Sequence, residues 1–247
     1  MPRFFVEQVG NCPALTGEDA AHAVKSLRMR VGEELTLCDS SRMDHRCVVR
    51  AVTPDTVELA VLESTPNEAE LPCRVSLYVA LPKADKLELI VQKAVELGVY
   101  EVIPVLSARC VSRPDAKSMR TRIVRLNRIA LEAAKQCGRG MVPAVGELLD
   151  FDTALTRMRT SSLAMLCYEK GGEELGSLLP PYSRQSIALM TGSEGGFEPE
   201  EAERARLAGV VPVTLGKRIL RAETAPLYAL SVIAYLNSAL GYTVPCI

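Results

Sequence analysis

Two glycine-rich segments near the C-terminal end of the chain combine backbone freedom with ionisable side chains. They are residues 191–197 and residues 215–224, and each follows an apolar run that is typical of a β-strand. Glycine allows tight turns and lets backbone amides approach a ligand closely. A plain turn between a strand and a helix uses the same glycines, so these residues alone fit either a turn or a binding site.

The ionisable side chains of the two segments suit acid–base chemistry or the binding of a charged ligand. They are Glu194, Lys217, Arg218, Arg221 and Glu223. A carboxylate can accept a proton, and an arginine can stabilise an anion that develops during a reaction. Glu223 also precedes Thr224 and Pro226, where a helix is expected to begin, and the helix dipole favours a carboxylate there. Its role is therefore open between chemistry and helix stabilisation.

Several familiar catalytic patterns are missing from the sequence. There is no Gly-x-x-x-x-Gly-Lys-Ser/Thr phosphate loop and no Gly-x-Gly-x-x-Gly turn after a strand, which argues against nucleoside triphosphatases and dinucleotide enzymes. The two histidines, His22 and His45, both lie near the N-terminus. A histidine-based triad within the C-terminal part is therefore excluded, and the two histidines suit a structural or an RNA-contacting role.

The composition indicates a globular protein with reduced thiols. The chain has 247 residues, of which 48% are apolar and 24% charged, an ordinary balance for a globular fold. Eight cysteines are scattered without a Cys-x-x-Cys pair: Cys12, Cys38, Cys47, Cys73, Cys110, Cys137, Cys167 and Cys246. This spacing fits neither a zinc site nor a disulfide framework. No signal peptide is expected, because no long apolar run follows residues 1–5, and no membrane span is expected, because the most apolar stretch, residues 225–240, is shorter than about 20 residues.

One segment of this nearly neutral chain is strongly basic. The net charge is −1, yet residues 109–139 carry nine basic and two acidic side chains, a local excess of +7. The basic residues are Arg109, Arg113, Lys117, Arg120, Arg122, Arg125, Arg128, Lys135 and Arg139. Such a segment is either a surface that binds a phosphate backbone or simply a solvated helix face.

The pattern of strands and helices divides the chain at a polar stretch, residues 64–72. Residues 1–70 are expected to form a β-rich domain, with a helix at 18–29 and strands at 33–39, 45–52 and 56–63. In residues 71–247 strands alternate with helices, which predicts a mainly parallel sheet covered on both faces. Its strands are expected at 73–81, 101–106, 163–168, 187–192 and 210–215, and its helices at 83–97, 118–137, 199–207 and 225–240. Ligands bind such sheets beyond the carboxyl ends of the strands, which is where the two glycine-rich segments lie.

The two glycine-rich segments closely resemble those of one enzyme family. The sequences Thr-Gly-Ser-Glu-Gly-Gly-Phe at 191–197 and Leu-Gly-Lys-Arg-Ile-Leu-Arg-Ala-Glu-Thr-Ala at 215–225 are similar to those of the 16S ribosomal RNA (uridine-N3) methyltransferases of the SPOUT class. The similarity extends to Met-Pro-Arg-Phe-Phe at 1–5, Leu-Pro-Lys at 81–83, Gln-Lys-Ala-Val-Glu-Leu-Gly at 92–98 and Ala-Ala-Lys-Gln-Cys-Gly-Arg at 133–139. Ser193 departs from the family, which usually has proline there.

The resemblance implies a fold, a cofactor and a site. It implies an α/β protein in which a small β-rich PUA-like domain (1–70) precedes a SPOUT domain (71–247) whose parallel sheet carries a trefoil knot. It implies homodimers and a pocket that binds S-adenosylmethionine, with the adenine near backbone groups of the knotted loops. The implied cofactor-binding residues are Leu166, Tyr168, Thr191, Gly192, Ser193, Glu194, Gly195, Gly196, Leu215, Gly216, Ile219, Leu220, Arg221, Thr224 and Ala225.

Methylation of uracil N3 makes a specific chemical demand, because N3 must lose its proton before or during attack on the methyl group. We expect Arg221 or Arg218 to stabilise the uracil anion, and Glu223 or Glu194 to accept the proton or to orient an arginine. The reaction requires no metal, and none is expected. The RNA-binding residues are expected to be Arg3, Lys25, Arg28, Arg30, Lys83, Arg113, Arg120 and Arg139.

These features predict a cytoplasmic enzyme that acts on 16S ribosomal RNA within the small ribosomal subunit, without contact with a membrane. Three other functions compete with this prediction. The first is a SPOUT methyltransferase that acts on another RNA, such as the ribose of transfer RNA. The second is a non-catalytic ribosome assembly factor, which would not need intact cofactor loops. The third is an enzyme acting on a small metabolite, which would not need the basic segment.

Overall fold

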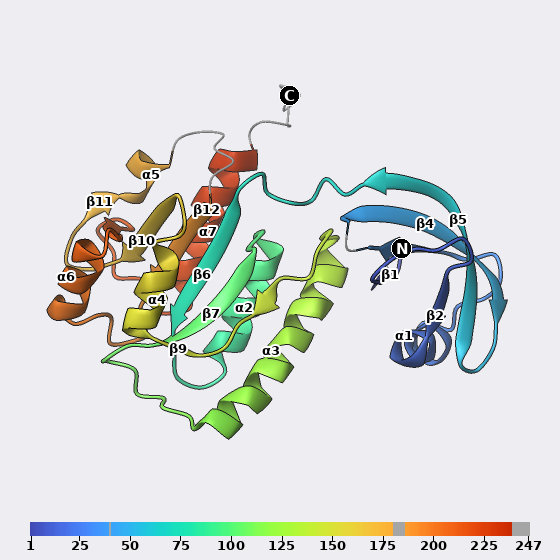
Figure 1. The fold of residues 1–247 in the computed structure, drawn as a ribbon, viewed down its shortest axis with the longest axis horizontal. Helices are drawn as coiled ribbons and strands as arrows, with labels where there is room; N and C mark the ends of the chain where they lie inside the picture. The colour runs from blue at the N-terminus through green and yellow to red at the C-terminus, as the bar shows by residue number, and fades with distance from the viewer. Residues whose placement is uncertain (40, 180–185, 239–247) are drawn as a thin grey trace. The chain divides into compact units, whose positions relative to one another are not determined.

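The computed structural model describes residues 1–39, 41–179 and 186–238 of the chain. They form two compact units. The first unit contains Met1–Glu70 together with Ala134–Val142, and the second contains Leu71–Ala133 together with Pro143–Ile247. The second unit resembles an open α/β domain, and the first is dominated by β-strands (Figure 1).

The first unit is built on a five-stranded mixed sheet in the order β1-β3-β4-β5-β2. The strands are β1 (Arg3–Phe5), β2 (Ala14–Thr16), β3 (Glu34–Cys38), β4 (Met43–Val52) and β5 (Thr56–Pro66). β1 pairs with β3 in parallel, and the other neighbours are antiparallel. Buried residues alternate along β4 and β5, as at Cys47 and Val49 and at Val57 and Leu59, because successive side chains of a strand point to opposite faces. The predicted β-rich N-terminal module is confirmed.

The sequence analysis did not predict the short strands β1 and β2, and two further details of the first unit differ from the prediction. The single helix expected at 18–29 is instead a short helix α1 (Gly17–Ala21) that continues as one π-helical turn, η1 (His22–Ser26), in which the amide of Leu27 donates to the carbonyl of His22. The polar stretch expected at 64–72 begins later, because β5 continues to Pro66, opposite Met43. The residues at the end of β5 are polar and exposed, and this part of the strand therefore has no hydrophobic alternation by which the sequence could identify it.

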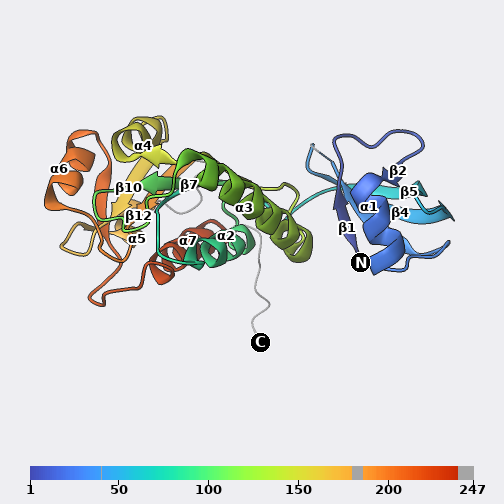
Figure 2. The same ribbon diagram turned by 90° about the horizontal axis from the view of Figure 1, so that it is seen from below.

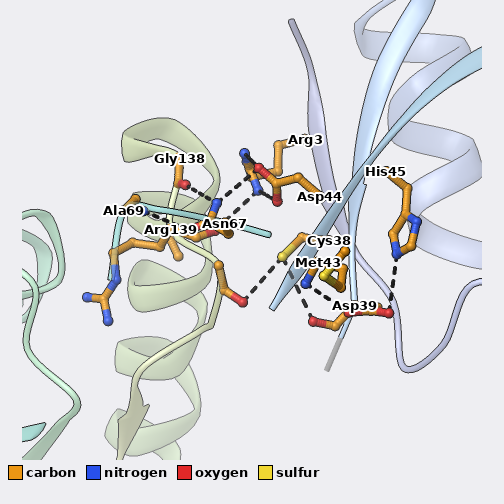
Figure 3. A network of polar contacts seen from close by, with 12 residues as sticks. Arg3, Cys38, Asp39, Met43, Asp44, His45, Asn67, Ala69, Gly138 and Arg139 are labelled. Atoms are coloured by element: carbon orange, nitrogen blue, oxygen red, sulfur yellow. Dashed lines mark hydrogen bonds and ion pairs between the residues drawn. The ribbon is translucent and has the colours of Figure 1, made fainter. Parts of the chain in front are cut away.

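A polar network fastens residues 138–140 within the first unit (Figure 3). The guanidinium of Arg3 donates to both carboxylate oxygens of Asp44, each at 2.6 Å. The side-chain amide of Asn67 donates to Asp44 and to the carbonyl of Gly138, both at 3.0 Å. These contacts connect the first strand, the β4 strand and the segment that follows α3 (Ala116–Cys137).

A second ion pair in this unit is almost completely buried. Arg139 donates through Nε and Nη2 to the two carboxylate oxygens of Glu70, at 2.8 and 2.7 Å, and the amide of Gly140 donates to the same carboxylate at 2.9 Å. The Arg139 side chain is 3% exposed and that of Glu70 is 10% exposed. The carboxylate therefore has three donors, which compensate for its loss of hydration.

The second unit contains a fully parallel sheet in the order β11-β13-β10-β12-β6-β7-β8, with β9 also paired with β7. Its strands are β6 (Arg74–Ala80), β7 (Glu101–Leu106), β8 (Ala144–Val145), β9 (Leu149–Asp150), β10 (Leu163–Cys167), β11 (Glu173–Glu174), β12 (Ser186–Thr191) and β13 (Val211–Thr214). The central strands are buried apolar runs, as expected for a sheet that is covered on both faces.

Helices cover this sheet on both faces, which confirms the predicted α/β architecture. They are α2 (Lys86–Glu96), the long α3, α4 (Phe151–Met158), α5 (Leu175–Leu178), α6 (Pro199–Leu207) and α7 (Thr224–Ser238). α2 and α7 pack side by side on one face, and α4 lies on the other (Figure 2). In α2 the apolar residues at helical spacing, such as Leu87, Ile90 and Val91, are all buried. The prediction did not include α4, α5, β8, β9 and β11, all short elements without a long periodic pattern.

The cysteines and the apolar stretch near the C-terminus are the remaining features that the sequence analysis singled out. Cys38, Cys47, Cys73, Cys110 and Cys167 are buried free thiols, whereas Cys12 is free and exposed. Cys246 and the last two residues of the helix expected at 225–240 lie outside the described residues. Within the described ranges, no helix has both the length and the apolar character that crossing a membrane requires. The trefoil knot stays a prediction.

Candidate active site

Three loops enclose a cavity of about 460 Å3 at the carboxyl edge of the second unit's sheet. They follow β10, β12 and β13, and these strands are adjacent because β10 lies between the other two. Parallel strands place their carboxyl ends at the same edge, so segments from 167–169, 192–196 and 215–222 converge there. The N-terminal end of α2, which follows β6 on the far side of β12, adds Lys86 to the lining.

The loop after β12 has a backbone shape that requires glycine. Gly196 has a φ of +66°, and a Cβ atom there would lie 2.8 Å from a carboxylate oxygen of Glu169. A Cβ on Gly192 would lie 3.1 Å from the Cα of Gly196. The turn closes through the amide of Gly196, which donates to the carbonyl of Ser193 at 3.0 Å. The serine that departs from the family pattern is thus compatible with a closed turn.

Arg109 and Ala108, which follow β7, hold the same loop in place. Arg109 donates to the carbonyl of Gly195 and to the carboxylate of Glu198, both at 2.8 Å. The amide of Ala108 donates at 2.8 Å to Glu201, a buried carboxylate whose other oxygen accepts from the amide of Glu198. The hydrogen bond to Glu198 raises the pKa of Arg109, which is therefore a permanent cation that fixes the loop.

Two carboxylates of the site share one lysine. The Nζ atom of Lys86 lies 2.9 Å from Glu194 and 3.1 Å from Glu223. Burial acts to raise the pKa of Glu194, but hydrogen bonds from Lys86 and from backbone amides outweigh it and lower that pKa. A hydrogen bond from its own backbone amide, together with Lys86, lowers the pKa of Glu223. Both carboxylates are therefore anions at neutral pH.

The structure brings most of the predicted site residues together. Those lining the cavity are Tyr168, Gly192, Ser193, Glu194, Gly195, Gly196, Leu215, Gly216, Lys217, Arg218, Ile219, Leu220, Arg221 and Ala225. Leu166, Thr191, Glu223 and Thr224 do not line it. Leu166 lies inside β10 and Thr224 begins α7, whereas Glu223 reaches the site through Lys86. Thr191 ends β12, and its buried Oγ1 has no hydrogen-bond partner among the described residues.

Several residues that line the cavity were not predicted from the sequence. These are Lys86, Cys167, Glu169 and Ala222. Cys167 and Glu169 flank Tyr168 at the end of a predicted strand, so position at the strand end was a usable signal for both. Lys86 carried no comparable signal, because its place beside Glu194 depends on β6 being the neighbour of β12.

The cavity fits S-adenosylmethionine. Its volume lies within the roughly 300–1,000 Å3 that is typical of small-molecule sites. Its glycine turn leaves backbone groups close to the ligand space, and the carboxylates of Glu169 and Glu194 provide negative charge for a cationic ligand. Among the described residues, no three His, Cys, Asp or Glu side chains gather in a way that could hold a metal ion.

Some basic side chains of residues 109–139 face solvent without a partner among the described residues, whereas others bind a carboxylate or a backbone carbonyl. Lys117, Arg120 and Arg128 are exposed on one stripe of α3, at helical spacing, and their side chains make no ion pair or hydrogen bond within the described part of the chain. Arg125 pairs with Glu88 and Arg122 donates to a backbone carbonyl. The charge of the segment 109–139 is therefore only partly available to a ligand.

The predicted RNA-binding residues divide in the same way. Lys25, Arg28, Arg30, Lys83 and Arg113 are exposed, although Arg113 also donates to the carbonyl of Ala108. Arg3 and Arg139 instead form the partly and fully buried ion pairs of the first unit. Their guanidinium groups are paired with carboxylates, which favours a structural role, and their contact with RNA stays a prediction.

Comparisons with known proteins identify the class and then the family. The fold and the site are those of an RNA methyltransferase: residues 69–234 match the RNA methyltransferase domain model, and residues 15–62 match the RNA methyltransferase PUA domain model. A ribosomal RNA small subunit methyltransferase E from Bacillus subtilis is 37% identical over 97% of this chain and 98% of that protein. The chain belongs to the ribosomal RNA small subunit methyltransferase E family.

Solved structures support this assignment. A ribosomal RNA small subunit methyltransferase E from Neisseria gonorrhoeae, bound to S-adenosylmethionine, is 31% identical with a TM-score of 0.85, covering 96% of this chain and 98% of that one. A structure from Legionella pneumophila, also with bound S-adenosylmethionine, is 29% identical with a TM-score of 0.83, covering 96% and 97%. The resemblance inferred from the sequence is confirmed, including the PUA-like first unit.

Proposed function

We propose that this protein transfers a methyl group from S-adenosylmethionine to N3 of a uridine in 16S ribosomal RNA, on the small ribosomal subunit in the cytoplasm. The observation that carries the proposal is the convergence of three loops on one cavity, with arginines and an ion-paired carboxylate cluster, in a member of this family. When bound, S-adenosylmethionine supplies an electrophilic methyl group on a positively charged sulfur.

The charges of the site favour stabilisation of the uracil anion over proton acceptance by a carboxylate. A general base works best when its pKa lies near the working pH. The pKa values of Glu194 and Glu223 are instead lowered, so neither carboxylate attracts a proton strongly. Arg218 and Arg221, which both line the cavity, are permanent cations that can bind the uracil oxygens where negative charge develops. We therefore assign the main chemical role to these arginines, which stabilise the uracil anion, and the N3 proton passes to solvent water.

The direct test uses labelled cofactor. The purified protein is incubated with methyl-labelled S-adenosylmethionine and with small ribosomal subunits that lack the modification, and the labelled nucleoside is identified after digestion. We expect N3-methyluridine. Labelled ribose would instead indicate a SPOUT enzyme with another RNA target, and no label despite measured cofactor binding would exclude small-subunit RNA as the substrate. A protein that binds no cofactor and labels nothing would support the assembly-factor alternative.

We propose that the exposed stripe of Lys117, Arg120 and Arg128 binds the phosphate backbone of this RNA. Each phosphate that a protein neutralises makes log affinity fall by about 0.7–0.9 per tenfold rise in salt. Replacing the three residues by alanine is expected to weaken RNA binding at low salt and to lower the salt slope by roughly two to three. A filter-binding titration over a series of salt concentrations measures the slope.

The control for this experiment is Arg125→Ala, on the same helix. Arg125 already pairs with Glu88 at 2.8 Å, so its loss is expected to change the salt slope less than loss of any one residue of the stripe. An unchanged slope in the triple variant would remove α3 from the RNA-binding surface.

We also propose that the protein is a homodimer, formed through an exposed face of α7. Tyr228, Val232 and Tyr235 follow one another at helical spacing, and Tyr228 and Tyr235 are 42% and 76% exposed. Large apolar side chains gathered on a surface mark an interaction site.

Tyr235→Glu is therefore expected to convert the dimer into a monomer, because a carboxylate loses its hydration when it is buried in an apolar interface. Sedimentation velocity over a range of protein concentrations measures the change. Leu207→Glu is the matched control, since Leu207 is 72% exposed on α6 and lies outside the proposed face. A Tyr235→Glu protein that sediments like the parent protein would place the interface elsewhere.

A further inference from the structure

We propose that Lys86 is a positioning residue of the methyl-transfer site, whose ammonium group holds the carboxylates of Glu194 and Glu223 together and keeps both of them ionised. The proposal rests on the proposed function, because it assigns both carboxylates to the site that binds the cofactor. It adds a residue from α2 to a site otherwise formed by the loops after β10, β12 and β13.

The geometry places Lys86 between two loops that are distant in sequence. Lys86 is the first residue of α2, Glu194 follows β12, and Glu223 directly precedes α7. One nitrogen atom contacts both carboxylates, at 2.9 and 3.1 Å. The backbone amide of Lys83 also donates to both oxygens of Glu194, at 3.2 and 3.3 Å. Residues 83–86 thus connect the glycine turn and the start of α7 to one helix end.

The three side chains are partly buried, so their interaction is less screened than that of a surface pair. Lys86 is 28% exposed, Glu194 is 29% exposed and Glu223 is 21% exposed. Hydrogen bonds to Glu194 and then Glu223 raise the pKa of Lys86. Lys86 is therefore a permanent cation at neutral pH and is unsuited to accept the proton of uracil N3.

Other titratable and charged groups lie in the cavity lining and in the helices next to this cluster. From the loops that line the cavity, the titratable or charged side chains are Cys167, Tyr168, Glu169, Lys217, Arg218 and Arg221. From α3, Arg122 donates to the carbonyl of Ala84 beside the start of α2. The packed helix α7 carries no charged side chain, and Tyr228 and Tyr235 are its titratable groups. Arg221 also favours the ionised form of Glu223, whereas Lys86 is the cation that contacts both carboxylates.

Removal of the ammonium group changes the acid–base behaviour of the pair. Two carboxylates held close together without a cation repel each other, and the pKa of one of them rises. As pH falls, that carboxylate gains a proton and the cavity loses one negative charge. S-adenosylmethionine carries a positive sulfonium group, so its affinity is expected to fall with pH in a protein that lacks Lys86. The parent protein keeps both charges through the same range.

The experiment measures the Kd of S-adenosylmethionine by calorimetry, without RNA, from about pH 8 to about pH 5.5. For Lys86→Met the affinity is expected to fall roughly tenfold over this range, against less than about threefold for the parent protein. Lys86→Arg keeps the cation, and its Kd for S-adenosylmethionine is expected to change as little with pH as that of the parent protein, which we call a flat profile. Lys93→Met is the matched control, because Lys93 forms an exposed pair with Glu96 on the same helix.

Two further measurements separate a positioning role from a loss of folding. Lys86→Met/Glu223→Gln leaves one carboxylate without a like-charged neighbour and is expected to return to the flat profile. Lys86→Gln, which keeps a polar group, is the substitute if the methionine variant fails to fold, as judged by its melting temperature. A flat profile in both folded Lys86 variants overturns the proposal while the proposed function stands. Absence of cofactor binding by the parent protein overturns both.

Discussion

Replacement of Arg221 by alanine is expected to lower kcat by about 10²–10³-fold and to leave the Kd of S-adenosylmethionine within about threefold of its parent value. Arg221 lines the cavity and is exposed, so its replacement removes a cation that we expect to stabilise the developing uracil anion. The backbone at this position is retained in the variant, and with it any contact that the backbone makes to the cofactor. Single-turnover methylation and calorimetry measure the two quantities separately.

Arg206→Ala is the matched control for this prediction. Arg206 forms an exposed pair with Glu203 on α6 and does not line the cavity, so its loss is expected to leave kcat unchanged. Arg218→Ala, measured in parallel, shows how much each of the two arginines contributes to stabilisation of the uracil anion. An Arg221→Ala protein with parental kcat would assign anion stabilisation to Arg218 or to another group in the RNA-bound state, and would contradict the proposed role of Arg221.

The second large effect is expected in stability. Arg139→Met leaves the carboxylate of Glu70 buried without its bidentate partner, and breaking a buried ion pair from one side costs about 3–5 kcal/mol. Urea unfolding is expected to show this loss of free energy of unfolding in the transition of the first unit, to which both residues belong. Far-ultraviolet circular dichroism follows the transition.

An exposed pair in the same unit provides the comparison. Arg46 pairs with Glu34 at 3.1 Å and with Glu63 at 3.4 Å, but all three side chains are more than 40% exposed, so Arg46→Met is expected to cost much less free energy of unfolding than Arg139→Met. Glu70→Gln/Arg139→Met is expected to cost less than the sum of the two single changes, because the residues interact directly. If Arg139→Met and Arg46→Met lowered the free energy of unfolding equally, the buried ion pair would contribute no more to stability than the exposed one.

The hydrophobic pattern was sufficient for the main elements of the fold. Buried strands such as β10 and β12 and the amphipathic helix α2 follow directly from apolar runs and helical spacing, because burial requires those side chains. Short elements could not be predicted from the hydrophobic pattern. β8 and β11 contain two residues each, too few for any period, and the π-helical turn η1 depends on backbone hydrogen bonds that side-chain spacing does not encode.

The candidate site was predictable where local backbone demands specific residues. Gly192 and Gly196 mark a turn that only a residue without a Cβ atom enters easily, and the arginines and carboxylates beside them are contiguous in sequence with such turns. Local sequence therefore specified the loops, the ionisable groups within them and the family to which they belong.

Contacts between residues from elements distant in sequence could not be predicted from local sequence, because they depend on the tertiary structure. Lys86 meets Glu194 and Glu223 because β6 and β12 are neighbours in the sheet, and Arg139 meets Glu70 because residues 134–142 belong to the first unit. Charge counting treated Arg139 and Arg120 alike, yet one is buried against a carboxylate and the other faces solvent. A sequence specifies which groups a chain carries and where its backbone turns, whereas the order of the strands decides which charges neutralise one another and which stay available to a ligand.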